Sequence, residues 1–152
     1  MRILSLAVLV FIALFGVNTA FAASPHFVGG APTFTDEGTT LSSAGSVAGL
    51  GNEDLTVVLD ATGVASVECI NPGGNRAPGQ DTNVVTSGTV EDIEVKNGRA
   101  FFNVTTAEPF VTGAEACPNP QWTAVVTDVA FTDATLTFFQ GGEQVLQESF
   151  GV

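Results

Sequence analysis

Alternation of inward and outward side chains at every second residue is the feature that most constrains how this chain can fold. Leu55, Val57 and Leu59 fall on one face of an extended segment, and three later segments repeat the pattern. They set Val67 and Cys69 against Glu68, Phe102 and Val104 against Asn103, and Leu136 and Phe138 against Thr135 and Thr137. A period of two is that of a strand with one buried face. No segment after residue 22 keeps the apolar period of an amphipathic helix, so the sequence predicts an all-β chain.

Glycine-containing turns divide these segments at short intervals. The dipeptide Asn97-Gly98 predicts a tight hairpin between residues 93–95 and 100–102, because both residue types tolerate a positive φ. Gly141-Gly142 predicts a second hairpin, and residues 49–52 mark a third turn. About eight or nine strands result, which predicts a single antiparallel β-sandwich of Ig-like architecture. The chain has no Tyr and its one Trp follows both cysteines, so it lacks the signature of a true immunoglobulin domain.

Val90 and Ile93 break the alternation, because residues three apart cannot both face inward on a regular strand. A β-bulge at Glu91 and Asp92 would restore the register. The alternative is that Val90 belongs to a separate edge strand.

The first 22 residues have the composition of a secretory signal peptide. Arg2 supplies a positive charge, residues 3–17 are almost wholly apolar, and Ala20 and Ala22 form an A-x-A cleavage motif. A membrane anchor is the alternative, but the apolar run is shorter than the roughly 20 residues of a membrane-spanning helix. We therefore expect residues 1–22 to be removed and residues 23–152 to be secreted as one domain that does not insert into a membrane.

Acidic side chains outnumber basic ones by a wide margin. The 152 residues include 16 Asp and Glu but only 4 Lys and Arg, which gives a net charge of −12. Removal of Arg2 with the signal peptide would leave Arg76, Lys96 and Arg99 against the same 16 acids, a net charge of −13. A nucleic-acid-binding protein needs a basic surface that displaces counterions, so this class of partner is excluded.

Cys69 and Cys117 are the two cysteines, and both lie in the part expected to be secreted. An even number of thiols in an oxidising compartment predicts a disulfide bond. The bond would close a loop of about 49 residues and contribute about 4 kcal/mol of stability in the chain-entropy model. A metal site is the alternative, but it needs further ligands and the chain has a single histidine, His26.

No catalytic constellation stands out in the sequence. A serine nucleophile needs a base, and His26 lies close to the expected cleavage point. The Gly-x-Ser-x-Gly motif is absent around Ser46, and 16 acids supply carboxylate pairs by chance. We expect neither an enzyme nor a resident cofactor. A weak extracellular calcium site, at pairs such as Asp36 and Glu37, is the alternative to a solvated acidic surface.

Two long segments, residues 71–80 and 106–120, are rich in Pro, Gly and amide side chains and predict loops. Each contains or directly follows a cysteine, so a disulfide would bring them together at one end of the sandwich, where sites are commonly found. The candidate binding residues at this end are Asn71, Asn75, Arg76, Gln80 and Trp122.

These side chains fit a ligand and also fit internal roles. The amides could bond sugar hydroxyls, Trp122 could stack on a sugar ring, and Arg76 could bind a carboxylate as an isolated positive charge. In the alternative, the Asn side chains bond their own backbone, Arg76 pairs with a nearby acid, and Trp122 belongs to the core.

The segment from Cys69 to Gln80 has the pattern C-x-N-P-G-G-N-x-A-P-G-Q. With residues 48–52 before it and 117–122 after it, the chain resembles a group of small secreted bacterial proteins, mainly actinobacterial, that have no assigned activity. The resemblance spans roughly residues 25–150. It implies a fold and a compartment but no chemistry.

These observations favour a secreted, non-catalytic interaction or surface module whose partner is an extracellular protein or a glycan. A structural subunit of a cell-surface assembly, joined by strand exchange through residues 24–35, is the alternative. A small extracellular hydrolase is a further alternative.

Overall fold

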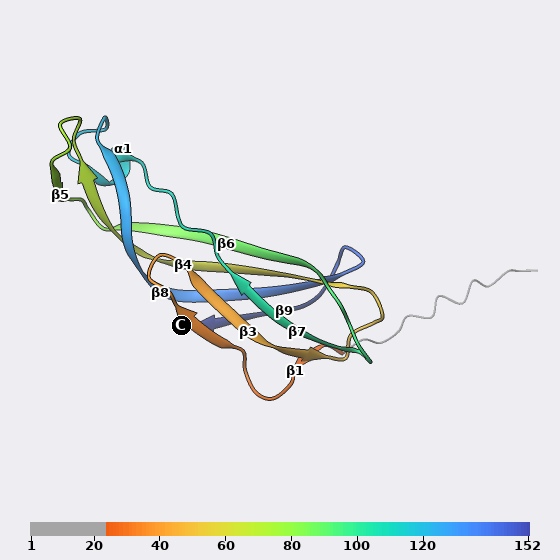
Figure 1. Ribbon diagram of the computed structural model, residues 1–152. Coiled ribbons are helices and arrows are strands. Elements are labelled where there is room, and N and C mark those ends of the chain that lie inside the picture. The colour runs from red at the N-terminus through yellow and green to blue at the C-terminus, as the bar shows by residue number, and fades with distance from the viewer. Residues whose placement is uncertain (1–23) are drawn as a thin grey trace, which may run out of the picture.

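The computed structural model describes residues 24–152, and the predicted signal peptide, residues 1–22, lies outside them. The described chain consists of nine strands and one short helix (Figure 1). In chain order the elements are β1 (His26–Phe27), β2 (Thr33–Asp36), β3 (Leu41–Ala48), β4 (Leu55–Ile70), β5 (Arg76–Pro78), β6 (Thr82–Ile93), β7 (Arg99–Thr105), α1 (Gly113–Ala116), β8 (Thr123–Gln140) and β9 (Glu143–Gly151). The Val-, Thr- and Phe-rich segments are extended, as their composition predicts.

The strands form two antiparallel sheets (Figure 1). In sheet A, β3 pairs with β7 along one edge and with β1 and β2 along the other. In sheet B, β4 lies between β8 and β6, β9 pairs with the far edge of β8, and β5 pairs with the end of β4. This arrangement confirms the predicted all-β sandwich and its number of strands.

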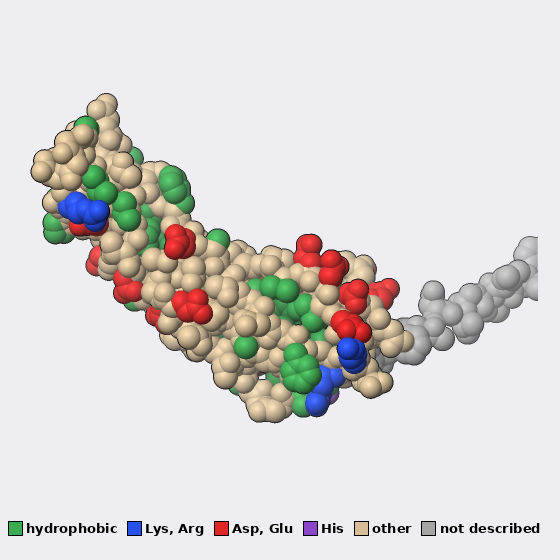
Figure 2. All heavy atoms as spheres, viewed as in Figure 1, with side chains coloured by type: hydrophobic (Ala, Val, Ile, Leu, Met, Phe, Trp, Pro, Cys, Tyr) green, Lys and Arg blue, Asp and Glu red, His purple; other side chains and the backbone are tan. Residues whose placement is uncertain are grey.

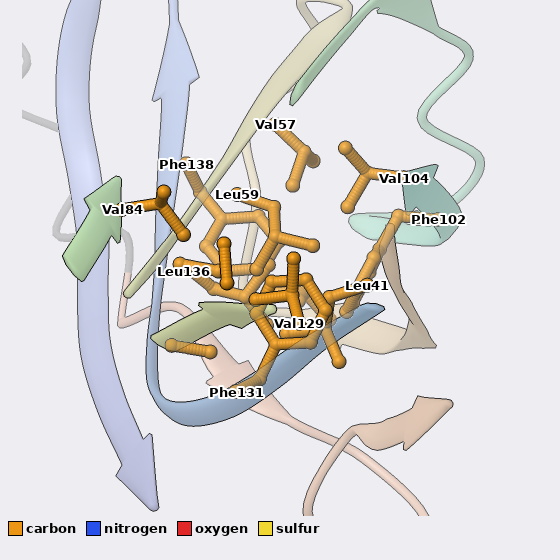
Figure 3. Close-up of a cluster of buried hydrophobic side chains, with 14 of the residues drawn as sticks. Leu41, Val57, Leu59, Val84, Phe102, Val104, Val129, Phe131, Leu136 and Phe138 are labelled. Carbon is orange, nitrogen blue, oxygen red and sulfur yellow. The ribbon is translucent and has the colours of Figure 1, made fainter. Parts of the chain in front are cut away.

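The core lies between the sheets and is built from the side chains that the alternation directs inward (Figure 3). Leu59, Leu136 and Phe138 reach it from sheet B, and Leu41 and Phe102 reach it from sheet A. The rings of Phe138 and Phe102 pack edge to face, with centroids 5.2 Å apart. Because burying one Leu or Phe side chain contributes about 1.5–3 kcal/mol, this cluster holds the two sheets together.

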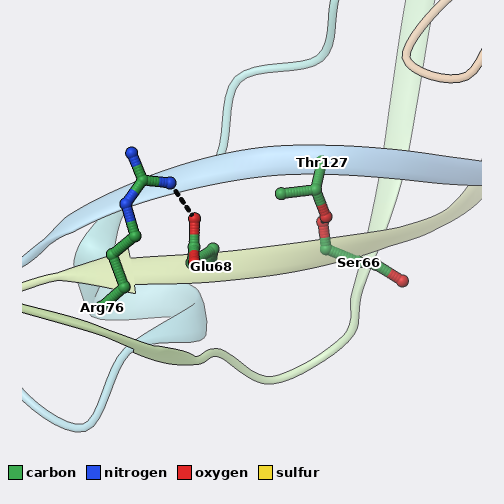
Figure 4. A network of polar contacts seen from close by, with 4 residues as sticks. All are labelled: Ser66, Glu68, Arg76 and Thr127. Atoms are coloured by element: carbon green, nitrogen blue, oxygen red, sulfur yellow. Dashed lines mark hydrogen bonds and ion pairs between the residues drawn. The ribbon is translucent and has the colours of Figure 1, made fainter.

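β4 and β8 are the longest strands, at 16 and 18 residues, and at one end they bend away from sheet A (Figure 1). Two register shifts in this pair each leave one threonine of β8, Thr127 or Thr132, without a partner in β4. The hydroxyl of Thr127 donates to the carbonyl of Ser66 at 3.1 Å (Figure 4), and that of Thr132 donates to the carbonyl of Thr62 at 3.4 Å. Such β-bulges bend a strand pair and increase its twist, which accounts for the change of direction.

We call the end of the molecule beyond the bulges, residues 66–81 and 111–128, the arm. It holds β5 and α1 beside the ends of β4 and β8. The expectation that residues 71–80 and 106–120 are loops throughout is wrong, because three residues of the first form β5 and four of the second form α1. The edge of β4 that faces residues 76–78 has main-chain N–H and C=O groups that need hydrogen-bond partners. Residues 76–78 are extended beside this edge and pair with it.

The bulge predicted at Glu91 and Asp92 is confirmed. β6 pairs with β4 on both sides of these two residues, which together lie opposite one residue of β4. Asp92 has a positive φ of 55°, and both Val90 and Ile93 pack against the core. The extra residue therefore restores the inward direction that a regular strand would have lost.

The turn at Asn97 and Gly98 has the predicted geometry but not the predicted flanking strands. Both residues have positive φ, 53° and 73°, and Lys96 and Arg99 exchange main-chain hydrogen bonds of 2.8 and 3.0 Å. The hairpin prediction is wrong, because β6 continues into sheet B whereas β7 continues into sheet A. β6 pairs with ten residues of β4, and β7 pairs with seven of β3. Each strand therefore forms more main-chain hydrogen bonds in its own sheet than the two would form with each other across the turn. The turn is a corner between the sheets.

The two ends of the described chain form outer strands. Residues 24–35 contain β1 and most of β2, which lie on the edge of this chain's own sheet A. β9 follows the turn at Gly141 and Gly142, where both φ angles are positive and the predicted hairpin is confirmed. Within residues 24–152, none of the helical structure is both long and apolar enough to span a bilayer.

Candidate binding surface

The predicted disulfide bond between Cys69 and Cys117 is present and closes the arm. The two Cα atoms lie 5.7 Å apart, and Cys69 is fully buried. Beside the bond, the main-chain N–H of Gln80 donates to the carbonyl of Ala116 at 2.8 Å. These links bring the segments after the two cysteines together, so all five candidate binding residues lie in the arm.

Asn71 closes the turn between β4 and β5 with its own side chain. Its Oδ1 accepts main-chain hydrogen bonds from Gly73 at 2.9 Å and from Asn75 at 3.0 Å. Its carbonyl accepts a further bond from Gly74, whose φ of 80° suits glycine. The amide oxygen of Asn71 is thus used within the loop. This confirms, for Asn71, the alternative that the Asn side chains bond their own backbone.

Arg76 forms an ion pair with Glu68, with Nη1 and Oε2 2.5 Å apart (Figure 4). Ile70 is the partner of Arg76 in the β4–β5 pair, so Glu68 is its diagonal neighbour on the same face. The side chain of Arg76 is 65% exposed and that of Glu68 is 30% exposed. The interpretation of Arg76 as an isolated positive charge is therefore wrong, and the alternative, pairing with a nearby acid, is confirmed.

The remaining candidates share the arm without forming one cluster of free polar groups. Asn75 and Gln80 are exposed, and Trp122 is half-buried. The main-chain N–H of Trp122 donates to the carbonyl of Asn119 at 3.0 Å, which places it in a turn just before β8. The arm thus gathers the predicted residues but uses Asn71 and Arg76 internally.

A second surface, the outer face of sheet A, carries the exposed Phe101. β7 alternates exposed and buried residues, so Phe102 faces the core, as predicted, and Phe101 faces outward. Its side chain is 72% exposed. Arg99 and Asn103 are exposed on the same strand, two residues before and two after. We call the outward residues of this strand, Arg99, Phe101, Asn103 and Thr105, the β7 row.

The strands of the two sheets differ in charge. Those of sheet A contain one acid, Asp36, along with His26 and Arg99. Those of sheet B contain one basic residue, Arg76, and eight acids: Asp60, Glu68, Glu91, Asp92, Asp128, Asp133, Glu143 and Glu148. Figure 2 shows basic side chains at both ends of the molecule, and at the end where β1 and β7 lie acidic side chains are found beside them.

Arg99 is the one Lys or Arg among residues 24–152 that forms no ion pair. Arg76 pairs with Glu68, and Lys96 pairs with Glu94 at 3.0 Å. In the register of sheet A, Arg99 lies opposite Ala48, which in turn lies opposite His26. The cross-strand neighbours of Arg99 therefore supply no carboxylate, and its charge is available to a partner.

Three hollows surround the first two residues of the β7 row. One of about 470 Å³ lies between the loop that joins β1 to β2 and the β3–β7 pair, lined by Gly29, Gly30, Ser46 and Phe101 among others. One of about 330 Å³ lies on the other side, lined by Glu94, Lys96, Arg99 and Phe101 among others. The largest, of about 530 Å³, adjoins the Asn97–Gly98 turn and is also lined by Arg99. All three are shallow and open to solvent.

Ser46 lines the hollow between the β1–β2 loop and the β3–β7 pair. Its hydroxyl oxygen is buried and has no hydrogen-bond partner among the described residues. A buried hydroxyl without a partner costs free energy, and a ligand hydroxyl that reached it would remove that cost. The chain therefore offers an aromatic ring, a free guanidinium and an unpaired hydroxyl within neighbouring strands.

Two titratable groups elsewhere, Glu115 and His26, have hydrogen-bond partners within the chain. At the start of α1, the carboxylate of Glu115 accepts hydrogen bonds from the N–H and the hydroxyl of Thr112, both at 2.7 Å, and these bonds lower the pKa of Glu115. Nδ1 of His26 lies 2.8 Å from the carbonyl of Ser24. Within residues 24–152, no three His, Cys, Asp or Glu side chains are grouped so that they could hold a metal ion.

The sequence analysis did not single out Phe101 or Arg99, although the alternation contained the signal. Phe102 and Val104 were assigned to the inner face, which requires Phe101 to face solvent. A large apolar residue at an outward position, two residues after a cation, is the pattern that marks the row.

No family model matches this chain, and neither a curated protein nor a solved structure shows significant similarity to it.

Proposed function

We propose that this protein is a non-catalytic extracellular interaction module and that it contacts its partner with the outer face of sheet A. The observation that carries the proposal is the juxtaposition of Phe101, 72% exposed, with Arg99, which has no acidic partner in the described chain. Interaction surfaces are enriched in aromatic residues and Arg, and depleted of acids at their centre. The strands of sheet A fit this composition, whereas those of sheet B do not.

The strand pairing of sheet A gives such a surface a rigid scaffold. β7 pairs with β3 over seven residues, and Phe102 anchors it in the core. Side chains on a paired strand keep their positions better than side chains on a loop, which reduces the entropy lost on binding. An exported protein with an intact disulfide bond can present this face outside the cell.

The proposal is tested with two double variants of the purified, disulfide-bonded protein. R99A/F101A removes the centre of the face, and N75A/Q80A removes two exposed polar side chains of the arm as a matched control. Immobilised proteins are exposed to neutral and acidic polysaccharides and to extracellular domains of surface proteins, and each polysaccharide is also assayed for chain cleavage.

We expect at least one binder whose affinity falls by about tenfold or more in R99A/F101A but not in N75A/Q80A. Three results would overturn the proposal: no binder in either panel, a binder that depends on the arm variant instead, or cleavage of a polysaccharide by the wild type. Melting temperatures of both variants establish that they are folded.

A further inference from the structure

The β7 row is long enough to hold an extended ligand. Outward residues of a strand are about 6.8 Å apart, so the row from Arg99 to Thr105 spans about 20 Å. Along this length it presents a guanidinium, an aromatic ring, an amide and a hydroxyl in turn, and all four residues are exposed. Groups of this kind, in a line on a rigid strand, suit a polymer whose units repeat polar and apolar faces.

The hollows give such a ligand room on both sides of Phe101. Gly29 and Gly30 line the hollow between the β1–β2 loop and the β3–β7 pair, and a Cβ added at either position would meet no atom within 4 Å, so an approaching molecule has room beside them. The loop that carries these glycines arches away from sheet A between β1 and β2 (Figure 1). The buried Ser46 hydroxyl adds a hydrogen-bonding group to the same hollow.

The chemistry of these groups selects the ligand class. The flat apolar face of a sugar ring packs on an exposed aromatic ring, and sugar hydroxyls bond amides and hydroxyls such as those of Asn103 and Ser46. A guanidinium binds a carboxylate with two parallel hydrogen bonds. Arg99 and Phe101 are two residues apart on one face, so a carboxylate and a ring of adjoining sugar units could engage them together.

We infer that the outer face of sheet A binds an acidic polysaccharide, of the kind built from uronic acid units, along the β7 row; this inference rests on the proposed function of that face. An acidic peptide fits the observations less well. Peptides anchor through large apolar side chains in deep apolar pockets. The hollow between the β1–β2 loop and the β3–β7 pair is wide open rather than deep, and three glycines, a serine and a threonine line it beside Phe101 and Phe102.

The net charge of the chain sets how strong this binding can be. Outside sheet A most charged side chains are acidic, and the net charge of −12 repels a polyanion at long range. The contact therefore depends on the local charge of Arg99 and on the ring of Phe101. Affinity for one short oligosaccharide is expected to be weak, and many units along one polymer would raise it.

The test is isothermal titration of the purified protein with short oligogalacturonate and with the same oligosaccharide after reduction of its carboxyl groups to alcohols. The reduced ligand keeps its rings and hydroxyls but lacks charge. We expect the wild type to bind the acidic form at least about tenfold more tightly. R99Q should remove that preference, F101A should weaken both ligands, and R76Q, the matched change at the paired arginine, should alter neither.

Three results would overturn the inference: no heat of binding with the acidic oligosaccharide, equal affinity for the two ligands, or an equal effect of R99Q and R76Q. If an acidic peptide bound this face and no oligosaccharide displaced it, the face would be assigned to a protein partner. A protein partner lost in R99A/F101A, together with no oligosaccharide binding, would contradict this inference alone and leave the proposed function intact. Unchanged melting temperatures of R99Q and F101A exclude misfolding as the cause.

Discussion

The arm and the outer face of sheet A each carry an arginine near an aromatic residue, yet they differ in whether those groups are already used. In the arm, Arg76 is paired with Glu68 and Trp122 is half-buried. On sheet A, Arg99 has no acidic partner among the described residues and Phe101 is largely exposed. Residue types alone therefore do not distinguish a binding surface from a closed turn, whereas their cross-strand neighbours do.

The difference arises from the strands that each arginine faces. β4 brings Glu68 beside Arg76, and Asn71 fills the turn between them with its own hydrogen bonds. β3 brings Ala48 beside Arg99, and no acid occurs on β1, β3 or β7. In the arm, Asn71 and Arg76 are bound to other groups of the arm. On sheet A, Arg99 pairs with no carboxylate among the described residues.

Removal of the disulfide should give the largest effect on stability and should leave binding by sheet A unchanged in the folded protein. In C69A/C117A the unfolded chain regains the freedom of a loop of about 49 residues, so we expect a loss of about 4 kcal/mol and a fall in melting temperature of several degrees per kcal/mol. The measurement is thermal unfolding under oxidising conditions. Loss of oligogalacturonate binding in this variant below its melting temperature would contradict the independence of the two regions, and an unchanged melting temperature would contradict the structural role of the bond.

Asn71→Ala should give the next largest effect. It leaves the main-chain N–H groups of Gly73 and Asn75 without their acceptor, and loss of a comparable cap costs about 1 kcal/mol. Asn75→Ala is the matched control, because its side chain is exposed and we expect a change within about 0.5 kcal/mol. Chemical denaturation measures both. Equal stabilities of the two variants would show that Asn71 does not close the turn.

The two arginines should then separate stability from binding. R76Q breaks an ion pair that is largely exposed, so its cost in stability should be no more than about 1 kcal/mol, and ligand binding should not change. R99Q breaks no ion pair within the described residues, so its stability should match the wild type while binding is lost. Thermal unfolding and titration of the same preparations test this. A reversed result, with binding lost in R76Q, would move the site to the arm.

Glu115→Gln should have the smallest effect, and that effect should depend on pH. Folding lowers the pKa of Glu115 through its bonds with Thr112, so its contribution is complete above the ordinary value of 4.5 and is lost as pH falls through the lowered value. We expect the variant to be slightly less stable at neutral pH and the difference to vanish in acid. Melting temperatures measured across this range test it, and a difference that persisted in acid would contradict the assigned cause.

Most of the fold could be predicted from the sequence, because the direction of each side chain along a strand follows from local spacing. Alternation predicted which side of each strand is buried, the three-residue spacing of Val90 and Ile93 predicted a bulge, and two cysteines predicted one disulfide. The division into sheets was not predictable from the Asn97–Gly98 turn, because a tight turn fixes a reversal of direction and not the partners of the strands that follow it.

The bulges of β8 and the pairing of Arg76 required contacts between distant segments. The spacing of Phe131 and Ala134 is three, the same signal as in β6, but which threonine leaves the ladder depends on the register with β4. Likewise, β5 and its diagonal contact with Glu68 exist only once the edge of β4 is free to accept a strand. Arg99 was not predicted as a site residue for the same reason, since its lack of an acidic neighbour depends on which strands pair in sheet A.

Mapping of main-chain amide chemical shifts during titration with oligogalacturonate tests the central claim most directly. The account predicts that the changes centre on β7 and on the residues that line the hollow beside the β1–β2 loop, among them Gly29, Gly30, Ser46 and Phe101. Amides of residues 71–75 in the arm should not move. Changes confined to the arm, or an absence of changes at saturating oligosaccharide, would contradict the assignment of the outer face of sheet A as the binding surface.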